Sequence, residues 1–285
     1  MNKIMDTKVV VLIIVSLLLG IIVGYAISLP EKQALKTKIA ELESKLNPNY
    51  VQKIKSRGKL IVGTSADWPP FEYIDKEGNF AGIDIQIAKK IAEALGVELE
   101  IKDMKFAALI EALKNGQVDI IIADITPKPE REQQIDFSIP YYHSKGYAVL
   151  TLKTKNIKSV EDLYGKKIGV QLGTIQEDWA KSNLGDKSEI KSYDRVYPDM
   201  VMVLKRGDVD TIIVGDTIGE VLANRDPELV IAFYAGHAAT GGAVGVPQGA
   251  EDLKYIVNKV IYDMLESGEM EKIFSTEIEK WLIKQ

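Results

Sequence analysis

The sequence predicts an α/β protein with two similar lobes, preceded by one membrane-spanning helix and a short helical stalk. Three observations lead to this expectation. A run of 21 uncharged, mostly aliphatic residues stands near the N-terminus, at 9–29. From residue 59 onward, short runs rich in Val and Ile alternate with amphipathic stretches, which is typical of a mostly parallel sheet covered by helices. A strand motif of the first half then returns in the second half.

The composition is that of an ordinary folded protein, with 285 residues of which 46% are hydrophobic and 27% charged. The net charge of -5 argues against a nucleic-acid partner. Cysteine is absent, which excludes disulfides, thiolate metal sites, cysteine nucleophiles and a lipid-modified N-terminal cysteine. Any membrane anchor must therefore be formed by the polypeptide itself.

The run at 9–29 is long enough to cross a membrane once. As a helix it spans roughly 31 Å, and the hydrocarbon core of a bilayer is about 30 Å thick. Lys3 and Lys8 before it also fit a cleaved signal peptide, whose apolar part is usually only about 7 to 15 residues long. We therefore expect an uncleaved anchor at residues 1–30 of a single-pass cell-membrane protein. The globular part would lie on the extracellular or periplasmic side.

A stalk is expected at residues 31–50. Apolar residues with helical spacing occupy one stripe of this segment: Leu35, Ile39, Leu42 and Leu46. Two heptads are too few to predict a stable coiled coil, so a solvated spacer is an equal alternative.

An internal repeat supports two lobes. The segments 116–126 and 207–217 share a turn, a buried strand and then an aspartate followed by a threonine, Asp124 in the first and Asp216 in the second. Open α/β sheets bind ligands at the carboxyl ends of their strands, so two such ends that face each other would form a cleft.

Two glycine-rich or extended segments, at 137–147 and 243–246, are predicted to carry the chain between the lobes and to form a hinge of two crossing segments. Lobe 1 would then contain residues 51–142 and 243–285. Lobe 2 would be the insertion 143–242.

Five motifs resemble those of a known family. They are GTSADWPPFEY at 63–73, GNFAGIDIQIAKKIAEALG at 78–96, GQVDIIIADITPKPEREQQIDFSIPYY at 116–142, GVQLGTIQ at 169–176 and VDTIIVGD at 209–216. Through them the chain from about residue 51 to its end resembles the bacterial extracellular solute-binding proteins, family 3, of polar amino-acid ABC importers. The resemblance implies the type II periplasmic-binding-protein fold. It also implies a polar L-amino acid as ligand, glutamine or a basic amino acid such as arginine, with a membrane permease and a separate ATPase subunit as partners and no cofactor.

The resemblance also implies which residues bind the main-chain groups of the ligand. Arg131 matches the arginine that holds the α-carboxylate, and a guanidinium suits that role because it offers a planar fork of donors and keeps its charge. Asp216 matches the aspartate that accepts the α-ammonium, and Thr126 matches a hydroxyl residue that contacts the same groups. Without the resemblance, Arg131 would be a solvated loop residue and Asp216 a helix cap.

Other matched positions surround the ligand. Trp68 and Phe106 match aromatic residues that cover the side chain of the ligand, although packing roles remain open for both. Ile175 and Gln176 match contacts from the second lobe, with Ile175 contributing its backbone.

The charge of the ligand is left open by one departure from the family. Ser65 stands where binders of basic amino acids often have aspartate, and Asp67 or Asp124 is close enough in sequence to replace that carboxylate. Gln171 stands where glutamine binders can have lysine, which weakens a simple glutamine assignment.

The alternative function is an enzyme on the same fold, since some relatives are cyclohexadienyl or arogenate dehydratases. Such chemistry needs a carboxylic acid poised to protonate a leaving hydroxyl, for which Asp67, Asp124 and Asp216 are the candidates. His143 and His237 have no partner at metal-ligand spacing, so neither a metal site nor a histidine base is expected. The binding protein is favoured over the enzyme.

Overall fold

The structure, a computed structural model, describes residues 29–46, 49–236 and 239–284. The chain divides into two compact units, residues 1–50 and 51–285. Apart from Leu29, the predicted membrane helix at 9–29 lies outside the described residues. None of the helices in the described ranges combines the length and the apolar character that crossing a membrane requires. The first unit contains helix α2 (Leu29–Leu46), which includes the expected helical stalk segment.

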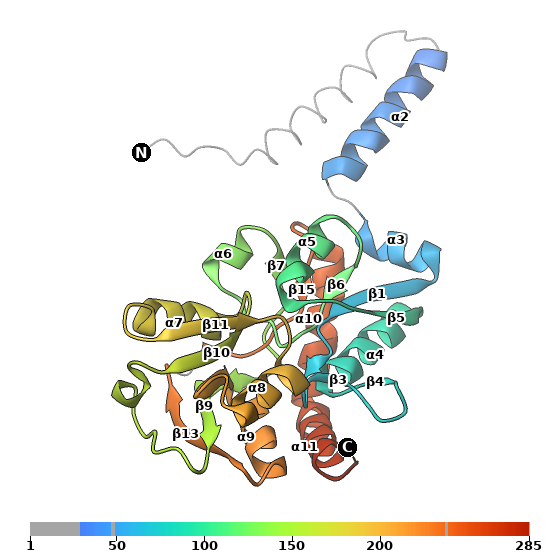
Figure 1. The fold of residues 1–285 in the computed structure, drawn as a ribbon. Helices are drawn as coiled ribbons and strands as arrows, with labels where there is room; N and C mark the ends of the chain where they lie inside the picture. The colour runs from blue at the N-terminus through green and yellow to red at the C-terminus, as the bar shows by residue number, and fades with distance from the viewer. Residues whose placement is uncertain (1–28, 47–48, 237–238, 285) are drawn as a thin grey trace. The chain divides into compact units, whose positions relative to one another are not determined.

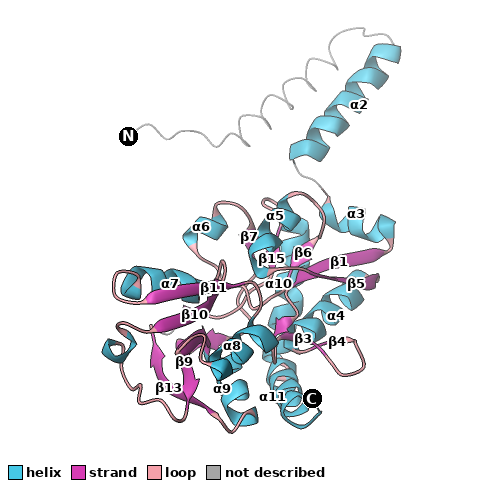
Figure 2. Cartoon of the chain, in the orientation of Figure 1, coloured by secondary structure: helices cyan, strands magenta, loops and turns pink. Residues whose placement is uncertain are grey.

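Two five-stranded sheets dominate the second unit (Figures 1 and 2), which also has a small sheet of β2 (Asp67–Trp68), β3 (Glu72–Ile74) and β4 (Phe80–Ala81). Sheet 1 has the order β5 (Glu98–Asp103), β1 (Lys59–Thr64), β6 (Ile120–Ile121), β15 (Gly245–Val246), β7 (Asp136–Phe137). Sheet 2 has the order β11 (Glu189–Tyr193), β10 (Lys167–Gln171), β12 (Thr211–Gly215), β9 (Tyr147–Leu152), β13 (Leu229–Ala235). In each sheet the first three strands are parallel and the remaining pairs are antiparallel. The repeated motif supplies β6 and β12, which hold the same central place in the two sheets.

Helices cover both sheets (Figure 1). Those of the sheet 1 side are α3 (Tyr50–Arg57), α4 (Ile83–Leu95), α5 (Leu109–Lys114), α6 (Pro129–Glu132), α10 (Glu251–Glu266) and α11 (Glu269–Lys284). Those of the sheet 2 side are α7 (Ile175–Leu184), α8 (Val201–Arg206) and α9 (Asp216–Arg225). Short helical turns lie at Phe106–Ala108, Glu161–Leu163 and Val196–Met200.

Helix α4 shows how the sequence produces these elements. Its Ile83, Ile87 and Ile91 recur at a spacing of four and are fully buried, so one face of the helix packs on the sheet. Gly82 precedes the helix with φ 116, and a Cβ there would lie 2.2 Å from the carbonyl oxygen of Phe71. Gly96 ends the helix in the left-handed conformation that favours glycine.

Each sheet has its own hydrophobic core. The core beside sheet 1 includes Leu109, Leu113, Val118, Ile121 and Ile135, and the core beside sheet 2 includes Val149, Ile168, Val170, Leu184 and Ile213. Two lobes are therefore present, as the sequence predicts.

The chain passes between the sheets twice, once between β7 and β9 and once between β13 and β15. In these passages β8 (His143–Ser144) pairs with β14 (Ala239–Thr240) in an antiparallel ladder, so the two crossing segments lie side by side. Of the segment predicted at 243–246, the last two residues already form β15 of sheet 1. The lobe limits 51–142, 143–242 and 243–285 stay a prediction.

Candidate ligand-binding pocket

A pocket lies between the carboxyl ends of the strands of the two sheets. It encloses about 470 Å³ of space free of atoms, part of it open to solvent. Loops that follow β1 and β6 line it from sheet 1, and residues at the ends of β10 and β12 line it from sheet 2. This is the place where open α/β sheets bind ligands.

The structure brings most of the predicted binding residues together in this pocket. Those that line it are Ser65, Trp68, Phe106, Asp124, Thr126, Arg131, Ile175 and Gln176. Asp67 and Asp216 are not among the lining residues, and both have other partners. Gln171, singled out as a departure from the family, also lines the pocket.

Arg131 is a buried cation with donors directed at the pocket walls. It lies on helix α6 and is 4% exposed. One terminal nitrogen donates to the carbonyl oxygen of Thr126 at 2.7 Å and the other donates to that of Gly173 at 2.9 Å, which joins the two lobes. Its guanidinium carbon lies 5.3 Å from the ring centre of Phe106. Burial lowers the pKa of Arg131 to about 10, so the side chain keeps its charge at neutral pH.

No carboxylate of the described residues forms an ion pair with Arg131. A guanidinium carries five N–H donors, and two carbonyl oxygens do not use all of them. Helix α7 also begins at the pocket with Ile175 and Gln176, after Thr174 accepts a hydrogen bond from the backbone N–H of Glu177 at 3.2 Å. The positive end of a helix and an unpaired guanidinium together suit a ligand carboxylate.

An acidic cluster of Glu72, Asp84 and Asp124 lies beside the pocket, and Glu72 and Asp124 line it. Asp124 accepts hydrogen bonds from the hydroxyl of Tyr142 at 2.5 Å and from Nε1 of Trp68 at 2.9 Å, and its own N–H donates to Asp84 at 2.7 Å. Glu72 and Asp84 are fully buried. Burial raises the pKa of Glu72 and of Asp124 well above their usual range, and it raises that of Asp84 to about 6.

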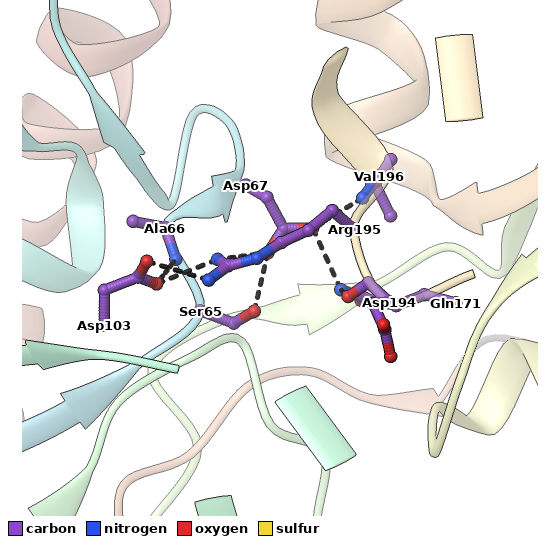
Figure 3. A network of polar contacts seen from close by, with 8 residues as sticks. All are labelled: Ser65, Ala66, Asp67, Asp103, Gln171, Asp194, Arg195 and Val196. Atoms are coloured by element: carbon purple, nitrogen blue, oxygen red, sulfur yellow. Dashed lines mark hydrogen bonds and ion pairs between the residues drawn. The ribbon is translucent and has the colours of Figure 1, made fainter. Parts of the chain in front are cut away.

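Asp67 instead belongs to an interlobe network of Asp67, Asp103, Gln171, Arg195 and Val196 (Figure 3). Its carboxylate accepts hydrogen bonds from Gln171 at 2.9 Å and from the N–H of Val196 at 2.5 Å, both on the sheet 2 side. Arg195 forms two hydrogen bonds of 2.8 Å to Asp103 and a longer contact of 3.4 Å to Asp67.

Asp67 does not line the pocket in this structure, so its direct contact with the ligand stays a prediction. Ser65 completes the set of partners by donating its hydroxyl proton to Asp67 at 2.6 Å. Asp67 is 2% exposed, and its oxygens face donors of the protein rather than the pocket. Burial raises its pKa to about 6 despite these donors.

Asp216 is the first residue of α9 and is 3% exposed. One of its oxygens accepts from the backbone N–H of Thr217 at 2.8 Å, and the other accepts from the N–H of Lys145. In this arrangement the carboxylate bonds the start of its own helix and the crossing segment, although the cap residue of α9 is Gly215 rather than Asp216.

The sequence reasoning did not select Glu72, Asp84, Asp103 or Arg195. Asp103 and Arg195 could have been found from their places in the chain. Asp103 is the last residue of β5, Arg195 closely follows β11, and the cleft forms at these strand ends. Glu72 stands in the otherwise apolar stretch PPFEY, where a charged residue is unusual. The described residues contain no group of His, Cys, Asp and Glu side chains arranged to hold a metal ion.

Comparisons with known proteins identify the family of this chain and agree with its two-lobe fold. The family model of bacterial extracellular solute-binding proteins, family 3, matches residues 60–282. The chain is 40% identical over 219 residues to the arginine-binding extracellular protein ArtP of Bacillus subtilis (strain 168), covering 75% of this chain and 84% of that protein. It is 30% identical over 242 residues to the L-cystine-binding protein TcyJ of Escherichia coli (strain K12), covering 84% and 88%.

Solved structures show the same similarity. The substrate-binding protein AbpA of an amino acid ABC transporter from Streptococcus pneumoniae, solved with bound L-arginine, has a TM-score of 0.77 and 34% identity. The match covers 82% of this chain and 100% of that one. These relatives are binding proteins rather than enzymes, which confirms the preference for a receptor. The protein therefore belongs to the bacterial extracellular solute-binding proteins, family 3, of amino-acid ABC transporters.

Proposed function

We propose that this protein is a membrane-anchored extracellular receptor that binds a polar L-amino acid, glutamine or a basic amino acid such as arginine, and delivers it to an ABC importer. The ligand would lie in the pocket between the two sheets. Closure of the two lobes would present a surface to the permease, while a separate ATPase subunit would supply the energy. The support is the pocket itself together with relatives named for binding arginine and cystine.

The observation that carries the proposal is the buried guanidinium of Arg131. A buried cation without a carboxylate partner among the described residues is costly unless an anion completes it. The α-carboxylate common to all amino acids has the shape and charge for that role. Thr126 and the start of α7 line the same pocket and would add further contacts.

Isothermal titration calorimetry with the twenty L-amino acids tests this proposal. Arg131→Ala should weaken the binding of the best ligand by roughly 2 to 5 kcal/mol, about 30-fold to several thousand-fold, because the ligand carboxylate would lose its charge partner. Lys187→Ala, which removes an exposed cation on the sheet 2 side, is the matched control and should leave affinity unchanged. Affinity within twofold of wild type for Arg131→Ala would remove this residue from the site.

A variant of Asp216 gives a second test of where the main-chain groups of the ligand bind. If its carboxylate also accepts the ligand ammonium, Asp216→Asn should weaken binding about as much as Arg131→Ala. If it only bonds the start of α9 and the segment at Lys145, affinity should change far less than the melting temperature.

The proposed anchor at residues 1–30 rests on the length of the uncharged run at 9–29. Alkaline carbonate extraction of membranes tests it. The full chain should stay in the membrane fraction and a chain starting at residue 51 should not. A mature mass lacking the first residues would indicate a cleaved signal peptide instead.

A further inference from the structure

We propose that a second pocket, on the sheet 2 side of the molecule, binds a small oxyanion through the guanidinium of Arg225. The oxyanion is the carboxylate or phosphate group of a solute. This site is separate from the ligand pocket described above, since the two pockets share no lining residue, and it does not depend on the proposed function.

The second pocket lies between α8, the end of α9 and the residues that lead into β13. It contains about 590 Å³ of space free of atoms, part of it open to solvent. Its polar lining residues are Tyr197, Lys205, Arg225, Asp226 and Glu228. The pocket therefore offers both cations and acids to a solute, and the partners of each decide which of them is available.

Arg225 differs from the other arginines of the chain. The sequence contains five, and the other four all donate hydrogen bonds to a carboxylate or a carbonyl oxygen: Arg57, Arg131, Arg195 and Arg206. Arg225 donates to no acceptor in the described part of the chain, and its Nη1 is fully buried. Buried polar atoms in folded proteins almost always have partners, so this guanidinium lacks one.

Aromatic rings hold this guanidinium in place without using its N–H donors. Its central carbon lies 4.4 Å from the ring centre of Trp281 and 5.8 Å from that of Tyr197. Trp281 is 1% exposed, and its ring centre lies 5.0 Å from that of Tyr197 and 4.9 Å from that of Tyr73, edge to face in both pairs. Contacts of this kind stabilise the cation through the face of the ring. The N–H donors are therefore left for an acceptor that the described residues do not supply.

A second donor beside Arg225 also lacks an acceptor. The indole Nε1 of Trp281 is buried and has no hydrogen-bond partner among the described residues. Trp281 lies on α11, and it packs against Val221 of α9 (Figure 1). Two adjacent donor side chains from different helices thus lack acceptors at one place, and an oxyanion has enough oxygens for both.

The acids of the second pocket have other partners. Lys205 forms ion pairs of 2.8 Å with both Asp226 and Glu228, and the other oxygen of Asp226 accepts the N–H of Glu228 at 3.0 Å. Within the described ranges, neither acid forms an ion pair with Arg225. An oxyanion suits this guanidinium because its oxygens match the planar fork of N–H donors. Since two acids lie in the same pocket, the affinity for an anion should be modest.

This site and the ligand pocket lie on opposite faces of β3. Successive side chains of a strand point to opposite faces, and Glu72 lines the ligand pocket while Tyr73 contacts Trp281. Helix α11 is bonded to α4 on the sheet 1 side, because Gln86 donates to Glu277 at 3.2 Å. A bound oxyanion would therefore strengthen the contact between α11 and α9 without touching the amino acid.

Titration of the full chain in mild detergent with inorganic phosphate and, separately, with acetate tests this proposal. Sodium chloride at equal ionic strength serves as the reference for general salt effects. The readout is the NMR signal of the indole N–H of Trp281, which the variant Trp281→Phe identifies among the three tryptophans. We expect this signal to shift and to saturate with at least one of the two anions. Saturation by phosphate alone would assign a phosphate group, and saturation by acetate alone a carboxylate.

Variants of Arg225 show whether its guanidinium binds the anion. Arg225→Gln removes the charge and should weaken anion binding roughly 10-fold to 150-fold. Arg225→Lys keeps the charge but loses the planar fork, so its affinity should lie between those of Arg225→Gln and wild type. The matched control is Arg206→Gln, at a 58% exposed arginine of α8 that pairs with Asp208, and it should leave anion binding unchanged. Amide signals of sheet 1 that stay at their wild-type positions would show that each variant is folded.

Two results would overturn the proposal. The absence of a saturating shift with either anion in the folded protein would mean that water, rather than an anion, meets the donors of Arg225. An equal shift at equal concentrations in wild type and in Arg225→Gln would place the anion elsewhere on the surface.

Discussion

Asp67 and Asp124 are aspartates from the same lobe, the first buried and the second half-buried, and their surroundings differ in kind. Asp67 faces a hydroxyl, an amide, a backbone N–H and a guanidinium, most of them from the opposite lobe. Asp124 and its neighbour Glu72 face no cation among the described residues and border the pocket. The first carboxylate has its donors within the protein and joins the lobes, whereas the second group lines the pocket. The difference teaches that the donors around an acid, more than its closeness to a cleft, indicate whether it binds ligand.

The largest effect is expected when the Asp67 carboxylate is removed, which tests whether this residue joins the lobes. Asp67→Ala should weaken every amino-acid ligand by a similar factor, about 30-fold to 150-fold, because the closed form loses buried hydrogen bonds worth roughly 2 to 3 kcal/mol. Small-angle scattering at saturating ligand should show a larger radius of gyration than in wild type. Calorimetry with arginine and lysine, and with any neutral ligand found, measures the first effect. A loss confined to cationic ligands would instead make Asp67 a ligand carboxylate, as the sequence suggests.

The pH dependence of stability is a second test of how Asp67 and the acidic cluster differ. The pKa values of Asp67 and Asp84 are raised to about 6 by burial, so between about pH 4 and pH 6 the folded state holds more protons than the unfolded state. Stability contributed by these groups therefore falls as pH rises through that window. We expect the melting temperature of ligand-free protein to decrease by several degrees as pH rises from about 4 to about 6 and to level off above that, and saturating arginine to reduce the decrease.

The variant Asp84→Asn isolates the contribution of Asp84 to the pH dependence of stability, because the asparagine amide does not titrate. The variant should lose less stability than wild type between about pH 4 and pH 6 in differential scanning fluorimetry. An identical slope for variant and wild type would mean that Asp84 does not titrate in this range.

Much of the fold could be predicted from the sequence because it depends on local patterns. The alternation of apolar runs and amphipathic stretches indicates the strands and helices, and the repeat around Asp124 and Asp216 places β6 and β12 at equivalent positions. Arg131 and Trp68 could be selected because they stand in motifs shared with the family. Residues 1–28 lie outside the described part of the chain, so the anchor stays a prediction.

The remainder of the site depends on contacts between segments far apart in the sequence. Nothing near Asp67 in the chain indicates that Val196 and Gln171 will meet it, because these residues belong to the other lobe. Glu72 and Asp84 become neighbours of Asp124 only when β3, α4 and the loop after β6 pack together. Sequence spacing groups Asp67 and Asp124 as candidate acids, but it does not tell which of them the other lobe will supply with donors.

The smallest expected effect concerns an ion pair between the lobes at the solvent-exposed rim. Lys128, before α6, pairs with Asp178 of α7, whose side chain is 54% exposed. Exposed pairs contribute about 0 to 1 kcal/mol, so Lys128→Ala should weaken ligand binding by less than about fivefold and affect all ligands alike. This loss should shrink further in high salt, because salt screens exposed charges, whereas the effect of Asp67→Ala should persist. Calorimetry at two salt concentrations distinguishes the two. A salt-independent loss as large as that of Asp67→Ala would mean that closure is controlled at the rim of the cleft rather than by the buried interlobe network.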